Sequence, residues 1–156
     1  MSRALRQWWA LPRRERVLLL VLMGLQPLLS LSLRLLGYRR TRAMLEALSQ
    51  RPAMPAVNPE QRAAAQRLAE LANIAGRRGP VASTCLRQAL AVHWLLRRRG
   101  LQPQLRFGVD RIGATPDMHA WVELEGVPLA QPQLRHRAFQ PATSASTAAT
   151  TDSSAS

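Results

Sequence analysis

The sequence predicts an α+β fold in which helices come first and a short antiparallel sheet follows. Two observations carry this prediction. Up to residue 100 the apolar residues recur at helical spacing between proline and glycine breaks, whereas from residue 105 they alternate as in strands. At 156 residues, the chain is long enough for one domain with an appendage.

The charge of the chain is strongly basic. Its 22 basic residues, all arginines, face 9 acidic ones, which gives a net charge of +13. Arginine without lysine is typical of codon bias in a GC-rich genome, but the charge still favours acidic peptides, anionic lipids or nucleic acid as partners. Nucleic-acid binding would also need stacking aromatic residues or a known motif. With seven aromatic residues and no such motif, we do not expect a nucleic-acid partner.

Cysteine and histidine are scarce. The single cysteine, Cys85, excludes a disulfide within these residues and gives no sign of an oxidising compartment, so we expect a cytoplasmic protein. The three histidines, His93, His119 and His136, are widely separated and no CxxC motif is present. We therefore predict neither a metal site nor a cofactor.

Residues 1–50 read as a basic, leucine-rich helical segment. Residues 17–33 carry no charge, but this length is at the bottom of the range for a membrane span, and Pro27 should kink or split the helix. Arginines flank the stretch on both sides and give no orientation. Arg34 stands where small residues should mark signal cleavage. Three structures remain open for this segment: a helical hairpin that faces the core or a partner, a membrane-surface anchor, and a true membrane span. We expect the segment to pack on the core or on a partner.

The middle of the chain begins with a proline-rich linker at residues 51–59. Asn58 as N-cap, Pro59 at the first helical position and Gln61 closing a capping box predict a helix that runs to about Ala75, ended by Gly76 and the following glycine-proline pair. We expect the core domain at residues 60–139. Residues 140–156 are of low complexity and should be disordered.

Cys85 lies where a chain would place a nucleophile. Ser83 or Thr84 is a good N-cap, and a strongly helical run follows as far as Arg99 and Gly100. Cys85 would thus occupy the first turn of a helix. There the unpaired backbone N–H groups and the helix dipole favour a thiolate over a thiol.

His119 is the best partner for this cysteine. Alternation predicts strands at residues 105–109, 119–124 and 127–129, with a loop at 113–117, so His119 begins a strand. His93 lies about 12 Å along the same helix as Cys85, too far to share a proton. His136 falls in the weakly structured C-terminal part. A thiolate needs a base, and the fold need only bring Cys85 and His119 together.

The group that would orient His119 is left open by the sequence. Gln131 is the amide best placed after the turn at residues 125–126. Asp117 shares a strand face with His119 if the strand begins early. Glu123 and Glu125 are further options, although Glu123 is about 13 Å from His119 along an extended strand, which argues against direct contact.

Four segments of the sequence, taken together, resemble the lasso peptide maturation proteases. They are residues 84–86, 96–101, 107–109 and 119–126. These are transglutaminase-like cysteine peptidases that remove the leader from a ribosomally made precursor. The most specific part is the cysteine helix followed by HAWVE-x-x-G. The basic start at residues 11–14, the leucine-rich helix and the basic residues 38–40 resemble the stand-alone form of the family. The resemblance covers residues 10–130.

The resemblance implies a papain-like or transglutaminase-like core, a cysteine helix packed on a short antiparallel sheet. It implies a Cys-His-Asp triad with Cys85 as nucleophile and His119 as base. At the aspartate position this chain has Gln131, and an amide can still orient a histidine. The implied partners are a precursor leader peptide, a separate leader-recognition protein and a lasso cyclase. The alternative is a non-catalytic or membrane-anchored binding subunit of a peptide-maturation complex.

Overall fold

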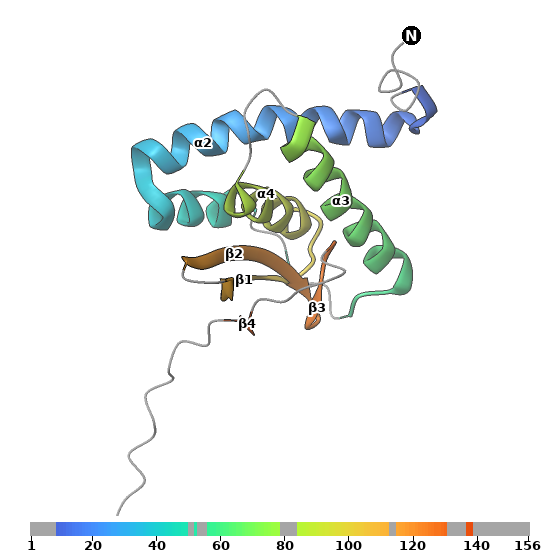
Figure 1. Cartoon of the computed structure of the whole chain (residues 1–156). Helices are drawn as coiled ribbons and strands as arrows, with labels where there is room; N and C mark the ends of the chain where they lie inside the picture. Colours follow the sequence, from blue (N-terminus) through green and yellow to red (C-terminus); the bar gives the residue numbers. More distant parts are fainter. Residues whose placement is uncertain are drawn as a thin grey trace, which may run out of the picture.

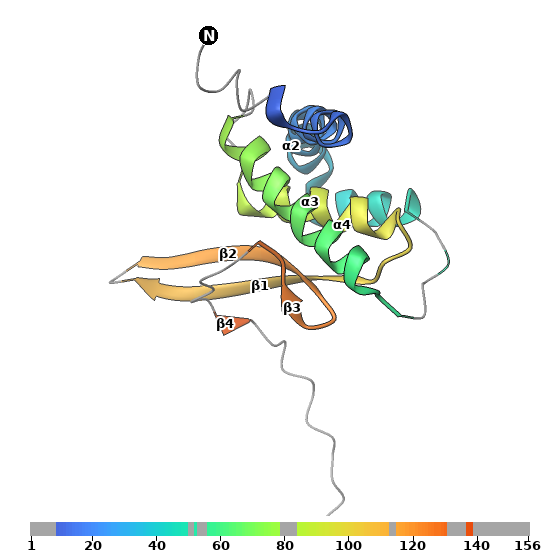
Figure 2. The same ribbon diagram turned by 90° about the vertical axis from the view of Figure 1, so that its right-hand side faces the viewer.

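The computed structural model describes residues 9–49, 52, 56–78, 84–112, 115–130 and 137–138. Its layers confirm the α+β prediction: a small sheet lies at the bottom of Figures 1 and 2, one helix packs on the sheet, a second packs against that helix, and the long N-terminal helix lies on top. The helices are α2 (Arg13–Ala47), α3 (Pro59–Arg78) and α4 (Cys85–Arg97). The strands are β1 (Pro103–Ile112), β2 (Thr115–Leu124), β3 (Val127–Pro128) and β4 (Arg137–Ala138).

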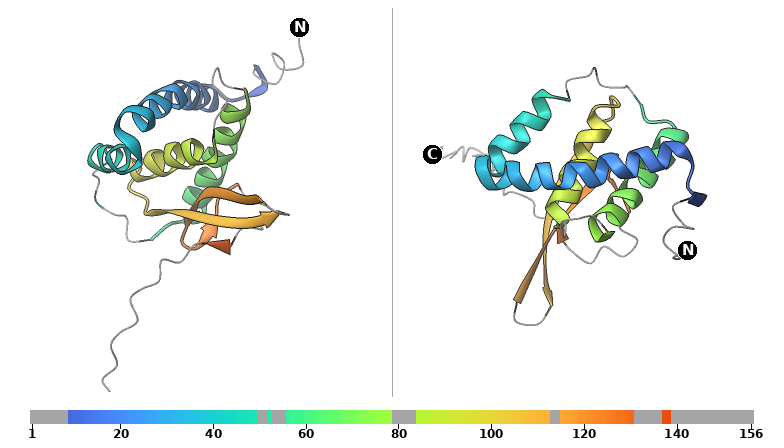
Figure 3. Two further views of the ribbon diagram at one scale, coloured as in Figure 1. Left: turned by 60° about the vertical axis from the view of Figure 1, so that its left-hand side comes forward. Right: turned by 90° about the horizontal axis from the view of Figure 1, so that it is seen from above.

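Helix α2 folds back on itself as a hairpin of two arms. The helix is not split at Pro27: the only non-helical residue inside α2 is Gly37, with φ 73° and ψ 173°. A proline removes one helical hydrogen bond but keeps a helical φ, whereas the reversal needs a left-handed φ, which glycine adopts without strain. A hydrogen bond of 2.9 Å between the hydroxyls of Ser32 and Thr41 joins the arms. Seen from above, the first arm crosses α3 and α4 (Figure 3).

The capping box at the start of α3 is confirmed. The Asn58 N–H donates to Gln61 Oε1 at 3.0 Å, and the Gln61 N–H donates to Asn58 Oδ1 at 2.8 Å. The predicted end near Ala75 is wrong, because the helix continues through Gly76 to Arg78. Gly76 is a packing residue rather than a stop: a methyl group there would overlap the Gln88 side chain of α4.

An ion pair holds α3 against the first arm of α2. The Arg67 guanidinium donates to both carboxylate oxygens of Glu15, at 2.7 and 3.0 Å. The hydrogen bonds from Arg67 lower the pKa of Glu15 below its ordinary value. The two-pronged geometry fixes the angle between α2 and α3.

Helix α4 begins and ends close to the predicted residues. Thr84 is its N-cap, and the Thr84 side chain accepts a hydrogen bond from the Arg87 N–H. The helix ends at Arg97; Gly100 has φ 81°, and the Leu101 N–H donates to the Leu96 carbonyl, as in a glycine C-cap. The middle of α4 is buried almost all round, between α2, α3 and the sheet.

The sheet is antiparallel with strand order β3-β2-β1-β4. Strands β1 and β2 pair over their full length, with Gly108 opposite His119. Residues 115–117, expected in a loop, belong to β2, because backbone pairing with β1 extends past the stretch in which side chains alternate. β4 was not predicted. Gln131, His136 and the tail at 140–156 lie outside the described residues.

Candidate functional site

Cys85 is the first residue of α4 and faces β2. Its thiol is free and half-buried, and Sγ lies 3.9 Å from the Met118 carbonyl oxygen. Met118 immediately precedes His119 on β2. The N-cap at Thr84 therefore fixes the helix start, and the packing of α4 on β2 brings the cysteine to the histidine strand.

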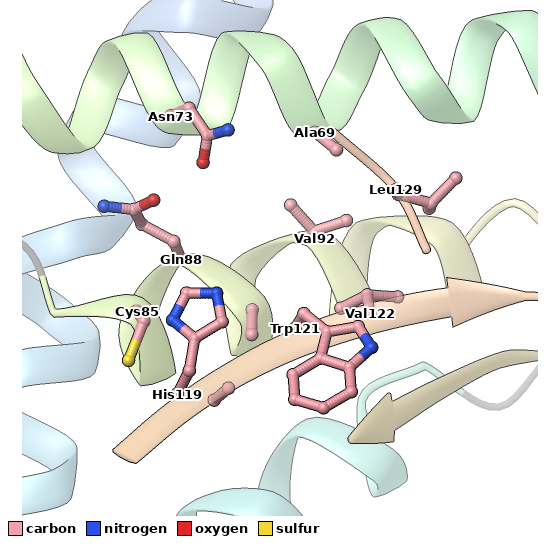
Figure 4. Close-up of a pocket in the computed structure, with 11 residues that line it drawn as sticks. Ala69, Asn73, Cys85, Gln88, Val92, His119, Trp121, Val122 and Leu129 are labelled. Atoms are coloured by element: carbon pink, nitrogen blue, oxygen red, sulfur yellow. The ribbon is translucent and has the colours of Figure 1, made fainter. Parts of the chain in front are cut away.

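Cys85 and His119 line the same pocket. Figure 4 shows the His119 imidazole beside the Cys85 side chain, with a ring nitrogen on the side that faces the cysteine. The pocket is open on one side and offers about 30 Å³, room for one small group such as a peptide carbonyl. The pair expected from the sequence is thus brought together by helix α4 and strand β2.

A chain of contacts along β2 supports the His119 ring. The Trp121 indole stacks on the imidazole with ring centres 6.1 Å apart and an angle of 17° between the planes. The indole N–H donates to Glu123 Oε1 at 3.0 Å, and Arg106 Nε donates to Glu123 Oε2 at 3.0 Å. The Glu123 carboxylate therefore holds the buried Trp121 indole, which packs against one side of the His119 ring.

Two amide side chains that the sequence did not single out also line the pocket. Asn73 comes from α3 and Gln88 from α4, one turn after Cys85; Figure 4 shows both above His119. Gln88 reaches this place because Gly76 has no side chain to exclude it. The sequence does hold a signal for this arrangement, because Gly76 lies inside an otherwise alanine-rich helix. Without knowledge of how α3 crosses α4, however, a glycine at this position predicts the end of the helix.

The segment that leads to Gln131 is held by α3. Gln66 Oε1 accepts a hydrogen bond from the Ala130 N–H at 3.1 Å, and Asn73 Nδ2 donates to the Ala130 carbonyl at 3.4 Å. Both polar groups of the Ala130 backbone are thus bonded to one helix. Gln131 itself lies beyond the described part of the chain.

The other acidic candidates occupy different places. Glu125, in the turn after β2, forms an ion pair with Arg62 of α3. Asp117 lies in β2 two residues before His119, and its backbone is opposite Asp110 in β1.

His93 is buried in α4, away from the pocket. Burial, together with the nearby charges of Arg97 and Arg42, lowers its pKa to about 4. At neutral pH the imidazole is therefore uncharged and belongs to the core. In the part of the chain that the structure describes, no group of three or more His, Cys, Asp or Glu side chains could hold a metal ion.

Comparison with known proteins identifies the family. No curated protein and no solved structure matches this chain. The model of the Transglutaminase-like superfamily matches residues 28–144, from the first arm of α2 through all four strands. The matched residues include both Cys85 and His119, the two residues that the fold brings to one pocket. The chain belongs to the transglutaminase-like superfamily.

Proposed function

We propose that this protein is a cysteine peptidase that removes the leader from a ribosomally made lasso peptide precursor. The observation that carries the proposal is the pocket shared by Cys85, at a helix start, and His119, on the adjacent strand. The superfamily includes cysteine peptidases. The choice of substrate rests on the resemblance of residues 10–130 to the stand-alone lasso proteases.

The reaction would proceed through a thioester. Cys85 Sγ attacks the carbonyl carbon of the scissile bond while His119 takes the thiol proton. The C–N bond then breaks as His119 returns this proton to the leaving amine. His119 next takes a proton from a water molecule, the hydroxide attacks the thioester, and the C–S bond breaks to release the leader as an acid and restore the thiol.

The negative oxygen formed in each attack needs hydrogen-bond donors. The backbone N–H groups in the first turn of α4 have no acceptor within the helix and point toward its start, where Cys85 stands. The Gln88 amide, from the next turn of α4, lines this pocket as a side-chain donor, whereas the Asn73 amide donates to the Ala130 carbonyl. We assign the oxyanion to the Cys85 N–H with Gln88 as the second donor.

Gln131 is our proposal for the group that orients His119. Its support is the double hydrogen bond that fixes Ala130, the preceding residue, to α3. If Gln131 holds the imidazole, Gln131→Asp should retain or raise the cleavage rate and Gln131→Ala should lower it, since a carboxylate stabilises imidazolium better than an amide. Equal rates for the three proteins would exclude Gln131 and leave Asp117, or no third group.

The resemblance also implies partners. We propose that a separate leader-recognition protein presents the precursor and that a cyclase closes the ring after cleavage. A short precursor gene and an asparagine-synthetase-like cyclase gene beside the gene for this chain would identify them.

The direct test is leader removal by the purified chain with that precursor and the leader-recognition protein, followed by mass spectrometry. Cys85→Ala and Cys85→Ser should abolish cleavage while circular dichroism stays unchanged. Cleavage by Cys85→Ala at the wild-type rate would exclude the mechanism. A thiol that does not react with iodoacetamide, in a chain that still binds its partners, would instead identify a binding subunit.

A further inference from the structure

The first arm of α2 carries a stripe of exposed apolar residues along its outer face. Leu20 and Val21 are adjacent and the other members follow one another at steps of three or four residues, so all of them share one side of the helix. The stripe extends about 27 Å at 1.5 Å per residue. Its valines and leucines are between 45% and 70% exposed, and a methyl group at Gly24 would meet nothing within 4 Å. The stripe consists of Val17, Leu20, Val21, Gly24, Leu28, Leu31 and Leu35.

The opposite face of the same arm is buried in the hydrophobic core. Leu19, Leu22 and Leu29 are at most 4% exposed and pack among the residues of α3 and α4. In the most apolar 18-residue stretch of α2, only 22% of the residues are buried. Of the helices that the structure describes, α2 is the one long and apolar enough to span a membrane. Spanning would require its inner face to leave the core.

Charge and aromatic residues at the ends of the stripe indicate what covers it. Arg13 and Arg14 are exposed before it, and Arg34, Arg39 and Arg40 are exposed at its far end. Trp9 precedes it, 64% exposed, with the Arg16 guanidinium 5.3 Å from the ring centre. The two acidic residues of α2 are both in ion pairs, Glu15 with Arg67 and Glu46 with Arg42. Leucines bordered by tryptophan and arginine are the composition of helices that lie in an anionic lipid interface.

We propose that the outer stripe of α2 lies in the plane of an anionic lipid bilayer and holds the protein at the membrane surface. The arginines at both ends contact lipid phosphates, and the stripe enters the acyl region. Figure 2 shows the first arm of α2 on one side of α3 and α4 and the sheet on the other, so binding through the outer face of α2 leaves the Cys85 pocket uncovered.

An apolar groove between the arms of α2 extends the same surface. Its volume is about 480 Å³, and Leu28, Leu31 and Leu35 of the stripe line it together with Met44 and Leu48 of the second arm. Apart from Ser32, the residues that line it are all apolar or aromatic. A groove of this size and composition accepts a lipid acyl chain, which would hold the hairpin in the bilayer on both sides of Gly37.

The test is flotation of the full chain, made by cell-free synthesis in the presence of vesicles. Aggregated protein stays at the bottom of the gradient, so flotation reports binding. The wild type should float with phosphatidylglycerol vesicles and much less with phosphatidylcholine vesicles. Leu20→Glu/Leu31→Glu should lower the floating fraction at least tenfold. The matched control Val109→Glu/Val127→Glu changes two exposed apolar residues of the sheet and should float like the wild type.

A second variant tests the charges without touching the stripe. Arg34→Gln/Arg39→Gln/Arg40→Gln should weaken binding to phosphatidylglycerol vesicles and reduce its salt dependence, with no effect on phosphatidylcholine vesicles; Arg13 and Arg14 remain to supply the rest of the charge. Cys85→Ala should float like the wild type, which separates this proposal from the proposed peptidase activity.

Three outcomes would overturn the proposal. One is wild-type protein that does not float with phosphatidylglycerol vesicles. Another is a lipid-free dimer that Leu20→Glu/Leu31→Glu converts to a monomer, since a second copy would then cover the stripe. The third is equal loss of flotation in the sheet control.

Discussion

Helices α2 and α4 are both rich in leucine, but the fold uses them differently. In α4, 7 of 13 residues are buried, because α2, α3 and the sheet enclose it. In α2, 6 of 35 are buried, because α3 and α4 contact only its inner face. Apolar composition alone therefore does not say whether a helix is enclosed. Whether a helix is enclosed depends on the number of elements that pack around it. Substitutions in and around the two helices should show this difference.

The largest effect of a substitution is expected on the cleavage rate, at the pocket that α4 forms with β2. His119→Ala should slow leader cleavage by about 10²–10⁴-fold, because the thiol loses its base. His93→Ala should leave the rate of the folded protein unchanged, because His93 lies in the core away from the pocket. Single-turnover cleavage rates measure both. Loss of activity in His93→Ala with an intact fold would exclude His119 as the base.

The second comparison is between the two faces of α2. Leu22→Ala removes a side chain with no exposed surface and should lower the free energy of unfolding by about 2–5 kcal/mol. Leu20→Ala, two residues earlier on the outer stripe, should change it by less than about 0.5 kcal/mol. Urea unfolding without lipid gives both values. A large cost at Leu20 would show that the stripe is covered in the free protein.

The pH dependence of stability should report the burial of His93. Its pKa falls from 6.5 to about 4 on folding. Between these values the unfolded chain binds a proton that the native chain does not, so stability decreases as the pH falls. The full effect is about 3 kcal/mol. Urea unfolding between pH 7 and pH 5 measures the slope, and His93→Gln should flatten it. An unchanged slope in that variant would assign the pH dependence to other groups.

The smallest effect is expected where α3 crosses α4. Gly76→Ala should displace the Gln88 amide and slow cleavage, while its better helix propensity limits the change in unfolding free energy to about 1 kcal/mol. Gly24→Ala is the matched control, since a methyl group there meets open space: it should stabilise slightly and leave cleavage unchanged. Equal cleavage by the two variants would show that the position of Gln88 is unimportant.

Local signals in the sequence located much of the fold. The Asn58–Gln61 capping box, the Thr84 cap and the Gly100 stop are each set by residues within one turn, and the structure has all three. The pairing of Cys85 with His119 followed because a helix start and a strand start are also local features.

What could not be predicted depends on contacts between distant segments. The roles of Asn73, Gln88 and Gly76 require the crossing of α3 over α4, and the contact of Arg106 with Glu123 requires the register of β1 on β2. The hairpin turn fell at Gly37 rather than Pro27, because the reversal needed a positive φ and not merely a missing N–H group.

Within these 156 residues Cys85 is the single thiol. If an oxidant converts Cys85 to a sulfenic acid, no second cysteine of the chain can trap it as an intramolecular disulfide. Rescue then depends on an external thiol such as glutathione, and without one oxidation proceeds to the irreversible sulfinic acid. The same isolation is useful at the bench, because one equivalent of a thiol-directed fluorophore labels the site and no other residue.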